Sequence, residues 1–212
     1  TFAGAFKDCS NLTGNIPANL FAAEALNYVK EIADAYGDAT LAEQAVQMRA
    51  EILAGVEKYG MVEHEKFGKI SAYEEDGLGN VNLMDDANVP SLLSLPWLRC
   101  LDASDEIYQN TRKFVLSKEN PFYYEGTAAK GIGSPHTPPS YVWHIALSMQ
   151  GLTSVDDAEK NELLKLLLST DAGTGYMHEG FDCNDPYQFT RDWFAWSNSL
   201  FALYVLNYFK LC

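Results

Sequence analysis

IPANLFAAEALNYVKEIADAYG, residues 16–37, is the stretch that most clearly sets the fold class of this chain. Pro17 stands where the first turn of a helix tolerates a proline, and Gly37 follows Tyr36 where the helical pattern stops. Between these points, apolar residues recur on one helical face: Leu20, Phe21, Ala23, Leu26, Val29 and Ile32. This spacing predicts an amphipathic helix that packs one face against a core.

Helical spacing continues over much of the remaining chain. It predicts further helices after Ser154 and over residues 40–59, 89–98, 105–116, 141–151 and 191–211. Residues 61–80 break the pattern with glycines and short β-branched pieces, which predicts irregular structure with a small hairpin. Paired helices joined by long polar loops are typical of an α/α toroid. We therefore expect an all-α fold in a single domain over residues 1–212.

The charge of the chain limits its partners. The 212 residues include 29 acidic and 15 basic side chains, a formal net charge of −14. Such a surface repels a phosphate backbone, so no nucleic-acid partner is expected. The most apolar segment, residues 193–211, is interrupted by polar residues, so no membrane partner is expected either. The compartment stays open between cytoplasmic and secreted.

Four cysteines are spread widely along the chain: Cys9, Cys100, Cys183 and Cys212. Their spacing does not match a zinc knuckle, and they are too sparse for a disulfide scaffold. We therefore expect them to be mostly free thiols.

Three polar side chains gather before a proline in NLMDDANVPSLLSLPWL, residues 82–98: Asp85, Asp86 and Asn88. Asp and Asn are preferred N-cap residues, so one of them could cap the helix predicted over residues 89–98. A single cap needs only one such side chain. A cluster of this kind also suits a group that binds a ligand outside the helix, and both interpretations stay open.

A second polar group lies in GIGSPHTPPSYVW, residues 131–143, where Ser134 and His136 stand on a loop rich in glycine and proline. Such a loop can hold a hydroxyl and an imidazole toward a ligand. The alternative is a loop histidine that only hydrogen-bonds to a backbone carbonyl.

A third group lies in TGYMHEGFDCNDP, residues 174–186. His178 and Glu179 begin like the H-E-x-x-H zinc motif, but Asp182 stands where the second histidine belongs, so no metal site is expected. Apolar and aromatic residues flank Glu179. A carboxylate in such surroundings is suited to proton transfer.

The fourth group, in TRDWFAWSN, residues 190–198, offers Arg191, Trp193 and Trp196 at the start of the last predicted helix. Core packing is the alternative for the tryptophans. The chain has neither a G-x-S-x-G elbow nor a phosphate-binding glycine loop. Carboxylates, amides and tryptophans on loops, without a nucleophile or metal motif, indicate a carbohydrate ligand.

Several segments in one order resemble glycoside hydrolase family 125, the exo-acting α-1,6-mannosidases with an (α/α)6 barrel. They are DGLGNVNLMDDANVPSLLSLPWL, ENPFYYEG, KGIGSPHT, LSMQGLTS, TGYMHEGF and TRDWFAWSNSLF, and they cover most of residues 76–201. The resemblance implies an inverting, metal-independent hydrolase without a cofactor. It also implies that the enzyme releases terminal mannose from α-mannosides or from oligosaccharides derived from N-glycans.

The resemblance further implies roles for single residues. Glu179, in the MHE motif, is the implied general base, and Asp8 is the implied general acid, although GAFKDCSN stands where the family shows a paired SDD. In an inverting enzyme these carboxyls lie roughly 6.5–9.5 Å apart, which leaves room for the attacking water. The residues assigned to hold and wall the mannose are Asp85, Asp86, Asn88, Ser134, His136, Arg191, Trp193 and Trp196.

The chain departs from the family in length, because it predicts too few helices for a closed (α/α)6 barrel. We therefore expect a partial barrel, the C-terminal part of a longer catalytic domain, with a missing N-terminal half as its partner. Two alternatives stay open. One is another inverting (α/α)6 glycosidase, of the glucoamylase or trehalase type, and the other is a non-catalytic carbohydrate-binding protein.

Overall fold

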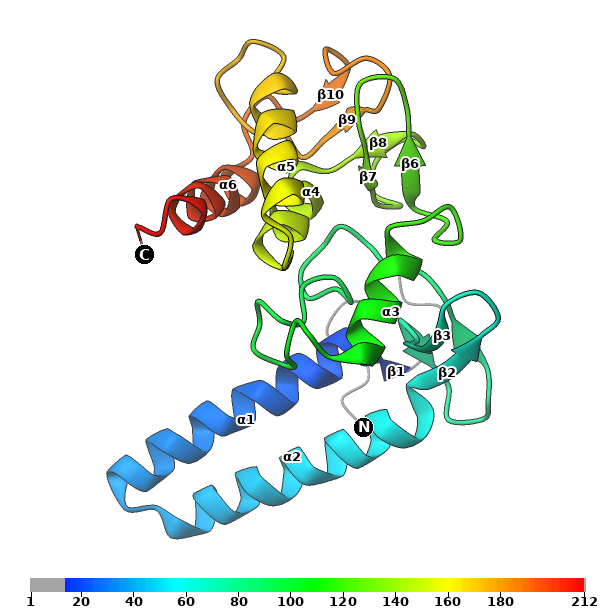
Figure 1. Ribbon diagram of the computed structural model, residues 1–212. Helices are drawn as coiled ribbons and strands as arrows, with labels where there is room; N and C mark the ends of the chain where they lie inside the picture. The colour runs from blue at the N-terminus through cyan, green and yellow to red at the C-terminus, as the bar shows by residue number, and fades with distance from the viewer. Residues whose placement is uncertain (1–13, 212) are drawn as a thin grey trace. The chain divides into compact units, whose positions relative to one another are not determined.

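The computed structural model describes residues 14–211 and combines helices with short β-strands (Figure 1). The helices are α1 (Ile16–Tyr36), α2 (Ala39–Tyr59), α3 (Glu106–Val115), α4 (His144–Leu152), α5 (Asp157–Ser169) and α6 (Ala195–Tyr208). The strands are β1 (Gly14–Asn15), β2 (Met61–His64), β3 (Gly68–Ser71), β4 (Glu74–Glu75), β5 (Val81–Asn82), β6 (Tyr123–Glu125), β7 (Lys130–Ile132), β8 (Tyr141–Val142), β9 (Gly180–Asp182) and β10 (Phe189–Thr190).

The prediction of an all-α fold with (α/α)6 barrel architecture is wrong, because within residues 14–211 the strands pair into four antiparallel sheets. Their strand orders are β1-β4-β5, β10-β9-β8, β2-β3 and β6-β7. Each strand has only two to four residues, too few to show the alternation that reveals a strand in a sequence. The backbone N–H and C=O groups of these loops nevertheless need hydrogen-bond partners where they are buried. Neighbouring loop segments supply these partners by pairing as short strands.

The described residues fall into two compact units. The first contains residues 14–83 and 90–111, and the second contains residues 84–89 and 112–211. Helix α3 carries the chain from the first unit into the second. Across residues 14–211, no helix combines the length and apolar character needed to cross a membrane.

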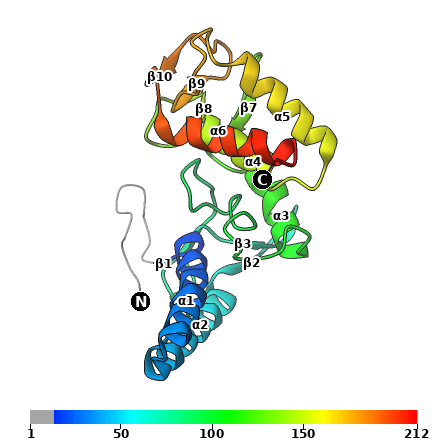
Figure 2. The same cartoon turned by 90° about the vertical axis from the view of Figure 1, so that its left-hand side faces the viewer.

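In the first unit, α1 and α2 lie side by side as a helical hairpin (Figure 1, Figure 2). The helix predicted over residues 16–37 is confirmed. Asn15 caps α1 by accepting a hydrogen bond from Ala18 N at 2.9 Å, and Gly37 ends it with a φ of 75°. The predicted small hairpin is also present, as β2 and β3.

Residues 89–98, predicted as a helix, form successive turns instead. Ser91 N donates to Ser94 Oγ at 2.8 Å, and Ser94 N donates to Ser91 Oγ at 3.2 Å. Serine side chains that bind the backbone in this way compete with helical hydrogen bonds. Pro96 then has no N–H to offer to a helix.

In the second unit, α4 contacts both α5 and α6. The apolar core contains Leu147 of α4, Leu167 of α5, Phe181 of β9 and Tyr204 of α6. Helices α4 and α6 approach closely at Gly151, where a Cβ would lie 2.3 Å from the Tyr204 ring. Phe181 anchors β9 in this core.

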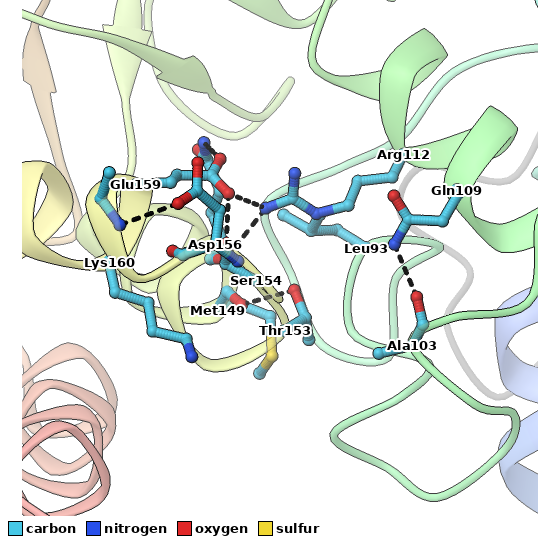
Figure 3. Close-up of polar contacts among 12 residues, drawn as sticks. Leu93, Ala103, Gln109, Arg112, Met149, Thr153, Ser154, Asp156, Glu159 and Lys160 are labelled. Atoms are coloured by element: carbon cyan, nitrogen blue, oxygen red, sulfur yellow. Dashed lines mark hydrogen bonds and ion pairs between the residues drawn. The ribbon is translucent and has the colours of Figure 1, made fainter.

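A polar network joins the end of α3 to α4 and α5 (Figure 3). Arg112 Nη2 donates to Glu159 Oε2 at 2.9 Å and to Gln150 O at 3.1 Å. Glu159 also accepts from Gln150 Nε2 at 2.7 Å and from the Ser154 hydroxyl. Burial raises the pKa of Glu159, but the hydrogen bonds from Ser154 and Gln150 and the charge of Arg112 outweigh burial and hold this pKa below its usual value.

Candidate functional site

Glu179 lies immediately before β9 and is held by its backbone and by one side chain. Its N–H donates to Thr190 O at 3.2 Å, beside the pairing of Gly180 with Thr190. Arg191 Nε lies 3.1 Å from Glu179 Oε2. Within residues 14–211 no group donates a hydrogen bond to the other oxygen, Oε1. The side chain is 13% exposed, so this carboxylate has one oxygen held and one available to water or a ligand.

Arg191 holds Glu179 from an uncommon backbone conformation. Its φ of 57° lies in the left-handed region, which residues with a Cβ seldom adopt. Its guanidinium lies over the Phe194 ring, 5.1 Å from the ring centroid. Because Arg191 turns the chain here, α6 begins at Ala195 and not at residue 191 as predicted.

His178, next to Glu179, is fully buried. Its ring stacks on Phe189 with centroids 3.8 Å apart. Nδ1 lies 3.1 Å from Arg191 O, and Nε2 lies 3.1 Å from Asp171 O. In the described part of the chain, no group of three or more His, Cys, Asp or Glu side chains could hold a metal ion. His178 therefore contributes hydrogen bonds to the backbone around Glu179.

A second buried histidine, His144 of α4, lies behind His178. The His178 N–H lies 2.9 Å from His144 Nδ1, and His144 Nε2 lies 3.1 Å from Thr170 Oγ1. The Thr170 hydroxyl donates to Leu166 O at 2.9 Å, so it accepts from Nε2–H, and Nδ1 accepts from His178. Burial lowers the pKa of His144 to about 3, which keeps the ring neutral for this role.

Asn198 of α6 clamps the backbone two residues before Glu179. Its Oδ1 accepts from Met177 N at 3.1 Å, and its Nδ2 donates to Met177 O at 2.9 Å and to Phe194 O at 2.8 Å. The side-chain amide thus pairs with both backbone groups of Met177, as a neighbouring strand would. Helix α6 thereby holds the segment that leads to Glu179.

Asp86 and Asn88 form a pair in the same unit. Asp86 Oδ2 accepts from Asn88 Nδ2 at 2.9 Å, and Oδ1 accepts from Asn88 N at 3.3 Å. Asp85 is fully buried, and Asn120 brackets its backbone with hydrogen bonds of 3.1 and 3.3 Å. Because residues 89–98 form turns, these side chains do not cap a helix there.

Ser134 and His136 form another local pair. Ser134 Oγ accepts from His136 N at 3.3 Å. Ser134 is buried, whereas His136 is exposed, with its ring centroid 6.4 Å from that of Trp143. The His136 imidazole is therefore exposed on this loop, whereas the Ser134 hydroxyl binds the backbone of the loop itself.

Two contacts tie this loop to the other site segments. Ala87 N donates to Gly133 O at 3.1 Å, which joins the loop to residues 84–89. Trp143 Nε1 donates to Thr137 Oγ1 at 2.9 Å. The Trp143 ring also packs on Gly180, where a Cβ would lie 2.8 Å from it. The residue after Glu179 is thus a glycine because the indole occupies the space of a side chain.

Trp193 and Trp196, which were predicted to contact the sugar, do not pack in the core, because they are 59% and 44% exposed. The Trp196 ring lies 6.2 Å from Phe194, whose ring lies 6.5 Å from that of Trp143. Exposed indoles in this segment suit contact with a sugar. Asp8, the predicted acid, lies outside the described residues.

The structure therefore brings the predicted residues together as three pairs, which are Glu179 with Arg191, Asp86 with Asn88, and Ser134 with His136. The sequence did not predict a supporting role for the groups that hold these pairs, namely His178, His144, Asn120, Trp143 and Asn198. His178 was considered only as a metal ligand. Asn198 carried a usable signal, since it is a polar residue in an otherwise apolar helix.

Comparison with known proteins points to one family. Residues 5–206 match the model of a family described as metal-independent alpha-mannosidase (GH125). The meiotically up-regulated gene 157 protein of Schizosaccharomyces pombe is 46% identical over 193 residues, which make up 91% of this chain and 38% of that protein.

A solved structure from Streptococcus pneumoniae is also similar, with 45% sequence identity and a TM-score of 0.95. It is described as a metal-independent alpha mannosidase in a non-productive substrate complex with alpha-1,6-mannobiose. The similarity covers 97% of this chain and 49% of the S. pneumoniae chain.

The chain thus spans half or less of the length of these two proteins. The family match nevertheless extends over residues 5–206, a range that contains every predicted site residue, Asp8 included. The chain belongs to the GH125 family of metal-independent alpha-mannosidases.

Proposed function

We propose that the protein is a glycoside hydrolase that releases terminal mannose from α-1,6-linked mannosides. The observation that carries this proposal is the Glu179 carboxylate, whose Oε2 meets Arg191 while Oε1 has no hydrogen-bond donor within residues 14–211. A positioned carboxylate oxygen of this kind is suited to take a proton from water. Family membership supports mannose as the sugar, and the S. pneumoniae relative was solved with alpha-1,6-mannobiose.

In the proposed reaction, Glu179 Oε1 takes a proton from a water molecule. The water oxygen bonds to the anomeric carbon while the bond from that carbon to the glycosidic oxygen breaks. A carboxylic acid, which we assign to Asp8, gives its proton to the departing oxygen. Attack from the opposite face inverts the anomeric centre, and the two carboxyls are expected roughly 6.5–9.5 Å apart.

The remaining pairs are suited to hold the sugar. Asp86 and Asn88 offer carboxylate and amide groups, and His136 offers an exposed imidazole. Trp193 and Trp196 offer exposed rings that can cover the apolar face of a pyranose. Ser134, which is buried, supports the backbone of His136 by accepting its N–H, and Asp85, buried like Asp86, is held at its backbone by Asn120.

The test is a proton NMR time course of the full-length protein with α-1,6-linked mannobiose. Early β-mannose, seen before mutarotation mixes the anomers, is the expected product of inversion. Early α-mannose would exclude an inverting reaction and the base role of Glu179 with it.

Two further outcomes would replace the proposal. Turnover of glucose disaccharides instead of mannobiose would indicate a glycosidase of another specificity. Binding of mannobiose in calorimetry, without any release of mannose, would indicate a carbohydrate-binding protein.

A further inference from the structure

Arg191 needs support for its backbone. A φ of 57° is unfavourable for a residue with a side chain, yet this conformation turns the chain between β10 and α6. It occurs while the Nε of Arg191 meets Glu179 Oε2 and its carbonyl oxygen faces His178 Nδ1, both at 3.1 Å. The contact with His178 therefore acts directly on the strained residue.

The His178 ring is well suited to act as a fixed support. It is fully buried and stacks on Phe189 with an interplanar angle of 10°. On another side it lies 5.7 Å from the His144 ring, and its own backbone N–H donates to His144 Nδ1 at 2.9 Å. A ring packed in this way has little freedom to rotate.

The position of the ring proton decides which carbonyl oxygen His178 can bind. A neutral imidazole has a single N–H. Nε2 lies 3.1 Å from Asp171 O, but that carbonyl oxygen already accepts from the Thr174 hydroxyl at 2.7 Å and from Thr174 N at 3.0 Å, so both of its lone pairs are occupied. Nδ1 faces the carbonyl oxygen of Arg191, which can only accept. These neighbours favour the tautomer with the proton on Nδ1.

We propose that His178 is a positioning residue for Glu179. Its Nδ1–H holds the Arg191 carbonyl, which keeps Arg191 in the left-handed conformation and its guanidinium in the ion pair with Glu179 Oε2. With Oε2 held, Oε1 stays directed toward the reacting water. This inference rests on the proposed function of Glu179 and predicts an effect on kcat more than on KM.

Replacing His178 by asparagine or by glutamine tests the Nδ1 and Nε2 positions of the ring separately. An asparagine amide places its N–H near the Nδ1 position, whereas a glutamine amide reaches the Nε2 position. We expect His178→Asn to keep most of kcat, and His178→Gln to lower kcat roughly 10- to 100-fold with little change in KM, because a small misplacement of a catalytic group is costly. Equal losses in the two variants, or the reverse order, would overturn the proposal.

A double-mutant cycle tests whether His178 acts through Arg191. In an Arg191→Ala background the asparagine and glutamine variants should have the same kcat, because the guanidinium that His178 positions is gone. If His178→Gln still costs roughly tenfold relative to His178→Asn in that background, His178 acts on Glu179 by another route and the proposal is wrong.

NMR gives a readout that does not depend on turnover. In the wild-type protein, a long-range proton–nitrogen spectrum should show His178 protonated at Nδ1, and the Arg191 Nε–H signal should persist in His178→Asn but move in His178→Gln. A ring protonated only at Nε2 would sink the inference whatever the activity. If both spectra agree but no mannose is released, the positioning role stands and the proposed function fails.

Discussion

Two arginine–glutamate pairs in the second unit have similar distances and different surroundings. Arg112 and Glu159 lie 2.9 Å apart, with side chains 13% and 25% exposed (Figure 3). Arg191 and Glu179 lie 3.1 Å apart, with side chains 60% and 13% exposed. Glu159 accepts hydrogen bonds at both oxygens, whereas Glu179 has the ion pair with Arg191 at Oε2 and, among the described residues, no hydrogen-bond donor at Oε1.

If Glu179 is the base that we propose, the same kind of ion pair joins helices in one place and positions a reacting group in the other. In the network of Glu159, every carboxylate oxygen is occupied, so the group can only join helices. Around Glu179, the arginine occupies one oxygen and stays in contact with water, so the other oxygen can react. A glutamate's bonding partners, and not its burial alone, distinguish the two roles.

The largest expected effect comes from replacing the two glutamates by glutamine. Glu179→Gln should lower kcat for α-1,6-mannobiose by about 10²- to 10⁴-fold, the range of a lost general base, while sugar binding persists. Glu159→Gln is the matched control, and its kcat should stay near that of the wild type. Similar kcat losses in the two variants would show that Glu179 has no catalytic role that Glu159 lacks.

The second-largest effect concerns the contribution of the Arg112–Glu159 pair to stability. Arg112→Ala leaves Glu159 buried without its charged partner, so we expect the free energy of unfolding to fall by about 3 kcal/mol in urea titrations. Breaking the exposed Lys30–Asp34 pair with Lys30→Ala is the control and should change stability little, because its side chains are 45% and 51% exposed. A loss at Arg112 no larger than at Lys30 would contradict this assignment.

A third test uses the neutral histidine that lies behind the functional pair. The pKa of His144 is about 3 in the folded chain against an ordinary 6.5, so below pH 6.5 the unfolded chain binds a proton that the folded chain does not. The contribution of His144 to stability is therefore fully present above pH 6.5 and is lost toward pH 3, by about 2 kcal/mol between pH 7 and pH 5.

His144→Asn keeps an acceptor for the His178 N–H and should flatten this pH dependence. The measurement is the free energy of unfolding at pH 7 and pH 5. Glu159 adds little to the change between pH 7 and pH 5. The stabilisation that comes from its lowered pKa is lost only as the pH falls below 4.5, the ordinary pKa of a glutamate. An unchanged slope in His144→Asn would show that another group is responsible.

The smallest effect concerns the shape of the arginine. Arg191→Lys keeps the charge but loses the planar Nε–H, so kcat should fall roughly tenfold with little change in stability. Arg99→Lys is a matched control, because Arg99 also has a left-handed φ, of 61°, and lies in the first unit. A kcat unaffected at both positions would mean that charge alone, and not the Nε–H contact, sustains Glu179.

The sequence predicted the long helices and the β2–β3 hairpin, but not the other described sheets. Helix α1 carries its apolar residues over enough turns for the period to show, and its cap and glycine stop mark its ends. The strands of two to four residues carry no period, and their pairing depends on contacts such as Phe181 with Phe189. The turns over residues 89–98 arise from Ser91 and Ser94, whose reciprocal hydrogen bonds local apolar spacing does not reveal.

At the candidate site, the sequence suggested the groups that we propose to react and not the groups that support them. Glu179 was predicted from its apolar and aromatic neighbours and from the family resemblance, and Arg191 from its place beside two tryptophans at the start of a predicted helix. Their contact depends on the left-handed φ of Arg191, which no residue preference would predict for an arginine. His178 and Asn198 act on backbone groups, and such partners depend on the fold rather than on any motif.

The amide clamp of Asn198 on Met177 also affects how this region can vary in evolution or design. A strand ladder can slip by a residue and stay bonded, but a single amide recognises a single peptide unit and has no alternative register. The loop between β9 and β10, residues 183–188, could therefore gain or lose residues while the segment before Glu179 keeps its place. Variation in the length of this loop is thereby separated from the position of the Glu179 carboxylate.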